Sequence, residues 1–230
     1  YGLETIRNAI EDLFDYSERL MRLQIQEIPD GVYSATGYVD GFQGEDNPAV
    51  QNLPIKVTLT VSGSDIAVDF TGTADQVEGY AINMPFVGTV DVAVWLTLRS
   101  VLLDTDVFGP IPQNDGLYRP VTITAPEGSL TNPVYPVPTI ARFAPGNIVA
   151  DTIMKALAPA RPKQVSAGVA NLKVIAFSGL RGNEQWVHLE IFEGSYGGRY
   201  GSDGLDCVDT LYANTRNNPI EDLETHVPVS

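Results

Sequence analysis

Strict alternation of apolar and polar residues constrains the fold of this chain more than any other feature of its sequence. Apolar side chains occupy every second position in two runs: Ile55, Val57, Leu59 and Val61, then Ile66, Val68 and Phe70. A Ser-Gly-Ser-Asp turn at residues 62–65 separates the two runs. Because strand side chains alternate between the two faces of a sheet, the pattern predicts a β-hairpin with one buried face.

The beginning of the chain follows a different period. One stripe recurs at spacings of three and four residues and holds Leu3, Ile6, Ile10, Leu13, Ser17, Leu20 and Gln24. This spacing predicts an amphipathic helix over residues 3–27, which the Pro-Asp-Gly turn at 29–31 ends. We interpret residues 1–31 as a leading docking helix, on a sheet or on another subunit, and residues 32–230 as an α+β core.

The remaining elements do not alternate regularly between strand and helix. They are expected as a buried helix at 89–103, a short strand at 121–124, a helix at 148–157 capped by Asn147, and strands at about 169–177 and 185–192. Proline- and glycine-rich stretches at 104–120 and 126–147 separate them. This order predicts an α+β fold, with mixed or antiparallel sheets, packed helices and long Pro/Gly-rich loops.

Charge and cysteine content exclude several classes of function. Asp and Glu outnumber Lys and Arg by 29 to 14, which gives a formal net charge of −15. Such a surface repels nucleic acid and anionic membranes, and no apolar run approaches the ~18 residues of a membrane span. The single cysteine, Cys207, permits no internal disulfide, which suits a reducing cytoplasm as well as some cysteine-poor secreted proteins. The chain starts without an initiator methionine or a signal-like segment, so we expect it to begin inside a longer gene product.

Residues 193–206 form the most unusual local feature. Five glycines lie in this run: Gly194, Gly197, Gly198, Gly201 and Gly204. Glycine allows backbone to approach a ligand or another backbone closely, so the run is either a structural turn or an anion-binding nest. It matches neither of the two glycine-rich nucleotide fingerprints.

Clusters of ionisable side chains are open to a structural and a functional interpretation. Asp203, Asp206 and Asp209 recur every third residue and either bind a divalent cation or form a solvated face. His188 and Glu190 share one face of a predicted strand, as a base-and-carboxylate pair or as a satisfied structural pair.

Four polar residues of the middle loops have two possible roles. Asn83, Asn114, Arg119 and Arg142 lie in or beside proline-rich segments. Side chains in such places often hold loop backbone together, and the alternative is that they line a substrate cleft.

A series of short motifs resembles the B-type subunit of the hydantoinase/oxoprolinase family, which includes N-methylhydantoinase and 5-oxoprolinase and is related to acetone and acetophenone carboxylases. The matching motifs run in family order: Ser17-Glu18-Arg19, Ile28-Pro29-Asp30-Gly31, Val68-Asp69-Phe70-Thr71-Gly72-Thr73, Ile82-Asn83, Pro112-Gln113-Asn114-Asp115-Gly116, Arg119-Pro120, and residues 125–130, 193–206 and 212–224. We identify the chain as the central-to-late part of such a subunit.

The resemblance implies an ATP-dependent enzyme of two kinds of subunit. The A-type partner binds ATP and Mg and phosphorylates a carbonyl oxygen or bicarbonate, and the B-type partner then opens a cyclic amide. One alternative is a ketone carboxylase of the acetone or acetophenone type, and another is a non-catalytic assembly segment. The implied divalent metal belongs to a region upstream of Tyr1, so we expect no cofactor on this chain and no activity from it alone.

The resemblance also suggests which residues shape the cavity or its interface. They are Glu193, Arg199 and Asp203 around the glycine-rich run, together with Asn83, Asn114, Arg119 and Arg142. We assign no catalytic nucleophile and no metal ligand. The expected partners are the A-type subunit, the remaining part of the B-type subunit and a small-molecule substrate, in the cytoplasm.

Overall fold

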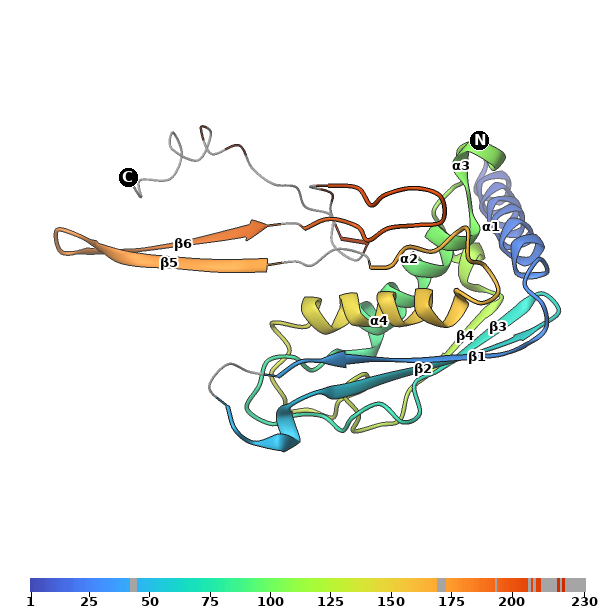
Figure 1. Cartoon of the computed structure of the whole chain (residues 1–230). Helices are drawn as coiled ribbons and strands as arrows, with labels where there is room; N and C mark the ends of the chain where they lie inside the picture. The colour runs from blue at the N-terminus through green and yellow to red at the C-terminus, as the bar shows by residue number, and fades with distance from the viewer. Residues whose placement is uncertain are drawn as a thin grey trace.

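The computed structural model describes residues 1–41, 45–168, 173–192, 194–206, 208, 210, 211, 219 and 221. Helices pack on one four-stranded sheet, and a separate two-stranded ribbon extends away from them (Figure 1). The expected α+β class is therefore confirmed.

The four-stranded sheet contains β1 (Gly31–Val39), β2 (Leu53–Ser62), β3 (Asp65–Asp69) and β4 (Val121–Thr124), in that spatial order. β1 and β3 both run antiparallel to β2, whereas β4 runs parallel to β3. The alternating sequence forms the β2–β3 hairpin, as predicted, with Ser62 paired to Asp65 at its turn. The sheet is thus mixed, with a long connection before its last strand.

The core lies between this sheet and two helices. The apolar residues of β2 are buried, while the polar residues between them are exposed or half-buried. Helix α4 (Phe143–Leu157) covers β1 and β2, and α2 (Asp91–Leu102) packs against α4. Gly37 of β1 allows this close packing, because a Cβ there would lie 2.3 Å from Thr152 Oγ1 of α4.

Helix α4 begins earlier than the sequence indicates. The predicted start at residue 148, capped by Asn147, is wrong: Asn147 lies inside the helix and is buried. Pro145 permits the earlier start, because a proline in the first turn removes no hydrogen bond that the helix needs.

Shorter helical turns occupy the connections between these elements. They are η1 (Pro48–Val50), η2 (Phe86–Val90), α3 (Thr105–Phe108) and η3 (Asp115–Tyr118). The last of these contacts the leading helix.

Helix α1 (Leu3–Ile25) has two unequal halves. In its second half Ser17, Met21 and Ile25 are buried, and the helix contacts η3 and α2. In its first half Leu3, Ile6, Ile10 and Leu13 are all exposed. The predicted amphipathic helix is confirmed, and its apolar stripe is only partly covered by this chain.

The ribbon pairs β5 (Lys173–Arg181) with β6 (Glu184–Phe192) in antiparallel register. It turns at residues 182–183, so the connection is shorter than the predicted one. Several of its large apolar side chains are exposed: Val174, Ile175, Phe177, Leu180, Val187, Leu189 and Phe192. A two-stranded ribbon is marginal in water by itself, so its faces are suited to being covered in a larger assembly.

Candidate functional site

Two cavities border elements that carry predicted site residues. The first, of about 360 Å³, lies along α1 and is lined by Asp15, Glu18, Arg19, Arg22, Leu23, Gln26 and Ser64. The second, of about 460 Å³, lies between the ends of α2 and α4 and the glycine-rich segment. They differ in how far their charges are already paired.

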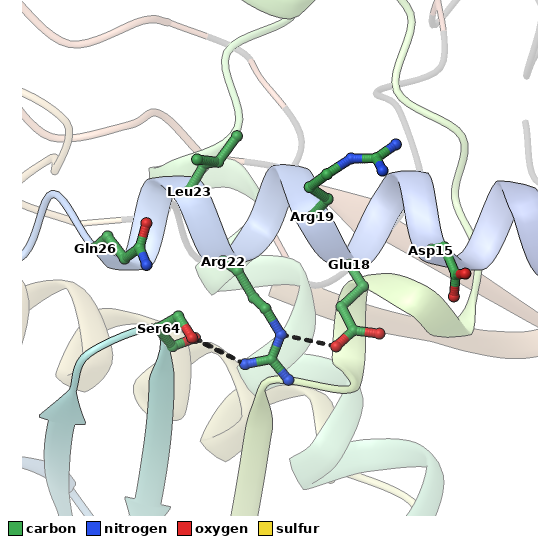
Figure 2. A pocket seen from close by; sticks show the side chains of 7 residues that line it. All are labelled: Asp15, Glu18, Arg19, Arg22, Leu23, Gln26 and Ser64. Atoms are coloured by element: carbon green, nitrogen blue, oxygen red, sulfur yellow. Dashed lines mark hydrogen bonds and ion pairs between the residues drawn. The ribbon is translucent and has the colours of Figure 1, made fainter.

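Charges in the first cavity are largely compensated from within the chain. Figure 2 shows Arg22 between Ser64 and Glu18: its Nε donates to Glu18 Oε1 at 2.7 Å, and its Nη1 donates to Ser64 Oγ at 3.1 Å. The same Nη1 lies 2.9 Å from Asp65 Oδ1. The Arg22 hydrogen bond lowers the pKa of Glu18, partial burial opposes that shift, and Arg119 adds to it. These contacts fasten α1 to the β2–β3 turn.

Arg119, expected beside a cleft, lies against α1 and lines neither cavity. Its guanidinium nitrogens lie 2.9 Å from Asp15 Oδ1, 3.1 Å from Glu11 Oε2 and 3.2 Å from Glu18 Oε2. Hydrogen bonds to these carboxylates, that to Glu18 foremost, raise the pKa of Arg119. The contacts favour a role in holding α1 to the segment that contains η3.

Asn114 joins the same two segments. Its Nδ2 donates to Ser17 Oγ at 2.8 Å, and its Oδ1 accepts from the backbone N–H of Gly116 at 2.9 Å. A Cβ on Gly116 would lie 2.1 Å from the carbonyl oxygen of Phe14, so glycine is needed for this approach. The loop-holding interpretation accounts for these contacts of Asn114.

Asn83 is fully buried and holds three loop segments together. Its Oδ1 accepts from the N–H of Val77 at 2.8 Å. Its Nδ2 lies 2.8 Å from the carbonyl oxygen of Val77, 3.1 Å from that of Tyr80 and 3.0 Å from that of Pro138. Every polar atom of this amide is therefore engaged with backbone.

The remaining predicted residues lie in different places. Arg142 stands at the start of α4, with its guanidinium 4.6 Å from the centre of the Phe143 ring. Asp203 is exposed in the glycine-rich segment, and Glu193 lies outside the described residues. Of the seven predicted site residues, the structure brings only Arg199 to the second cavity among those it describes.

The glycine-rich segment forms one wall of the second cavity and is shaped by backbone contact. The N–H of Ala167 donates to the carbonyl oxygen of Gly198 at 2.9 Å, and Tyr196 donates likewise to Leu205 at 2.9 Å. A Cβ on Gly204 would lie 1.8 Å from the carbonyl oxygen of Tyr196. The glycines thus allow backbone to approach backbone, as the structural-turn interpretation predicts, and Tyr196 and Arg199 of the same segment line the cavity.

Basic side chains dominate the charge of this cavity. Arg99 of α2, Lys163 of the loop after α4 and Arg199 of the glycine-rich segment line it, with Asp104 as the single acidic residue among the described lining residues. Asp104 Oδ1 already accepts from the N–H of Asp106 at 2.8 Å. The lining therefore carries an excess of two positive charges in a chain whose net charge is −15.

Sequence reasoning missed Arg99 and Lys163. The signal for Arg99 was present, because it is the one basic residue in the otherwise apolar second half of the 89–103 segment. For Lys163 there was no local signal, since its place depends on the packing of α4 against α2.

The other ionisable clusters do not assemble a metal site in the described part of the chain. Across those residues, no three side chains of His, Cys, Asp or Glu are grouped to hold a metal ion. Asp209 and Cys207 lie outside the described residues. The residues present therefore do not fit the divalent metal that the resemblance implies.

His188 and Glu190 form the pair predicted from strand alternation. Their Nε2 and Oε2 atoms lie 3.0 Å apart on β6, and Phe177 of β5 stacks 6.4 Å from the His188 ring. Neither residue lines the two cavities.

Comparison with known proteins decides the family. The sequence matches the family described as Hydantoinase B/oxoprolinase over residues 1–230. The chain belongs to this family. A B-type protein of Pseudomonas sp. (strain NS671), named as a subunit of a "Putative D-/L-hydantoinase", is 60% identical over 229 residues, which are 100% of this chain and 39% of that protein.

Solved structures share the fold. The family includes a crystal structure of the ATP-dependent caprolactamase from Pseudomonas jessenii, which matches 99% of this chain and 39% of its own with a TM-score of 0.78 at 26% identity. A nucleotide-free acetone carboxylase structure matches 91% of this chain and 29% of its own, with a TM-score of 0.71 at 15% identity, and shows the same fold.

These family members are longer than the matched region. The chain spans about two fifths of the hydantoinase and caprolactamase relatives. Its placement in the central-to-late part of such a subunit stays a prediction. In the described segments, each helix is too short or too polar to cross a membrane.

Proposed function

We propose that this chain is part of the B-type subunit of an ATP-dependent cyclic-amide hydrolase, which completes ring opening after an A-type partner phosphorylates the carbonyl oxygen. One observation carries the proposal: 60% identity over the whole chain to a protein named as the B-type component of a hydantoinase. The solved relative is named an ATP-dependent caprolactamase, and a lactam is a cyclic amide.

In this proposal the second cavity receives the reacting end of the substrate. Its volume of about 460 Å³ lies within the usual range of small-molecule sites. Apolar side chains including Val101, Met154 and Val165 form part of its wall and would limit the entry of water. Arg99 and Arg199 would stabilise negative charge that develops on the substrate as the ring opens.

ATP and Mg belong to the A-type partner in this proposal, where phosphorylation turns a poor leaving oxygen into a good one. The residues of this chain then bind the activated amide, orient it and keep water from it until the ring is opened. The divalent metal of the family is assigned to another part of the B-type polypeptide, and no step here depends on it.

Assembly is the second part of the proposal. The exposed apolar stripe of α1 and the exposed ribbon β5–β6 are the faces that we assign to the A-type partner and to the rest of the B-type subunit, in a cytoplasmic complex. Their exposure in this chain supports the assignment, because large apolar patches usually mark interfaces.

A reconstitution experiment tests the proposal. The complete B-type subunit and its A-type partner are purified separately and together, and the ring-opened acid formed from hydantoin is measured with and without ATP. We expect product only when both subunits and ATP are present. Ring opening at the full rate by the A-type partner alone would contradict the proposal.

The same preparation separates the two alternatives. A carboxylated product from acetone and bicarbonate, in place of ring opening, would identify a ketone carboxylase. Ring opening that survives substitution of every charged residue of the second cavity would identify a non-catalytic assembly segment.

A further inference from the structure

We propose that the second cavity is a binding site for a phosphate group, held by Arg99, Lys163 and Arg199. The inference rests on the cavity itself. The proposed function only supplies a reason why a small phosphorylated molecule would reach it.

Arg99 shows that the cavity holds an uncompensated charge. Its Nε is buried without a hydrogen-bond partner, and its guanidinium forms no hydrogen bond or ion pair within the described residues. A cation that is partly removed from water and left unpaired is unfavourable, so a bound anion would stabilise this arrangement. The contrast with Arg22 and Arg119 is direct, because each of those contacts carboxylates.

Lys163 and Arg199 bring two further charges from different segments. The Nζ of Lys163 lies 5.4 Å from the centre of the Tyr200 ring, a contact that leaves its hydrogen-bond donors available. The backbone N–H of Arg199 donates to Ser202 at 3.0 Å, which positions the residue while its side chain lines the cavity. Three separate segments therefore present cations to one space.

Charge matching favours a phosphate over a carboxylate. The excess of two positive charges in the lining equals the charge of a phosphate dianion near neutral pH, whereas a carboxylate carries one negative charge. Arginine is also suited to phosphate because its planar fork donates two parallel hydrogen bonds. The described backbone N–H groups of Ala167, Gly197 and Arg199 are engaged within the chain, so side chains would hold the ligand.

Calorimetric titration of the full protein with inorganic phosphate tests the site. We expect saturable binding at low ionic strength that Arg99→Met weakens by about tenfold, as for the loss of one charge-assisted hydrogen bond. Arg7→Met is the matched control, because Arg7 is exposed on α1 and is absent from the cavity lining. Absence of saturable binding, or equal binding by Arg99→Met and the parent, would overturn the proposal.

A second variant and two competitors sharpen the result. Arg199→Met removes an exposed cation and so weakens phosphate binding even if Arg99→Met fails to fold. Competition by ATP would support the site and identify a nucleotide as one source of the group, whereas acetate binding as tightly as phosphate would overturn the charge match. Because binding is measured without turnover, loss of ring opening with intact phosphate binding would count against the proposed function alone.

Discussion

Single side chains in the loops and helices of this protein have two different roles. Asn83 and Asn114 form hydrogen bonds with backbone, whereas the guanidinium of Arg99 forms none within the described residues. Satisfied polar groups stabilise a fold, and unsatisfied charged ones beside a cavity are candidates for ligand contact. The distinction needs coordinates, because the sequence does not show which polar side chains find a partner.

Replacing Asn83 by alanine should destabilise the fold. The substitution leaves the N–H of Val77 and neighbouring carbonyl oxygens buried without their partner, so we expect the free energy of unfolding to fall by about 2–4 kcal/mol. Denaturant titration measures this, with the exposed Asn8→Ala as control. An unchanged midpoint for Asn83→Ala would show that these hydrogen bonds do not hold the loops.

Gly204 should be irreplaceable for local reasons. A Cβ at this position would collide with the carbonyl oxygen of Tyr196, whereas one at Gly168 would meet nothing within 4 Å. We expect Gly204→Ala to speed trypsin cleavage after Arg199 by about tenfold, as for a local loss of about 1.4 kcal/mol, and Gly168→Ala to leave it unchanged. Equal cleavage rates for the two variants would argue against the close backbone approach.

At the scale of elements, sequence periodicity located most of the secondary structure. The hairpin of β2 and β3 and the strand β4 follow directly from alternation, because each has one face turned to the core. The start of α4 was missed, since Pro145 resembles a helix breaker and is in fact compatible with a first turn. Which half of the α1 stripe is buried could not be predicted, because that depends on where η3 docks.

Docking of α1 should depend on pH through Glu18. The hydrogen bond from Arg22 lowers the pKa of Glu18 below its ordinary value of 4.5. An acid whose folded pKa is depressed contributes stability above the unfolded pKa, and this stability is lost as the pH falls through the folded pKa. We therefore expect the melting temperature of Glu18→Gln to fall less steeply than that of the parent between neutral pH and about pH 3.

The exposed carboxylate Glu4 on the same helix provides the control for this prediction. Glu4→Gln should retain the parent's dependence of melting temperature on pH. Parallel curves for Glu18→Gln and the parent would show that the ion pairs of Arg22 do not contribute to stability.

For the whole molecule, net charge and local charge carry opposite information. The value of −15 argues against nucleic acid as a partner, and the sequence supported that conclusion without coordinates. The basic cavity is invisible at that scale, because Arg99, Lys163 and Arg199 are separated by 64 and 36 residues and meet only through tertiary packing. Motif order indicated the family, and the comparisons confirmed it, but neither indicated this cavity.

The most direct test of the proposed site is the value of kcat/KM for ATP-dependent ring opening by the complete enzyme carrying Arg199→Met, beside Arg7→Met. Because Arg199 is exposed and lines the cavity, we expect a fall of at least about tenfold, or ~1.4 kcal/mol of barrier, with an unchanged melting temperature. Arg7→Met should retain the parent value. An unchanged kcat/KM for Arg199→Met would contradict the claim that this cavity is the working site of the enzyme.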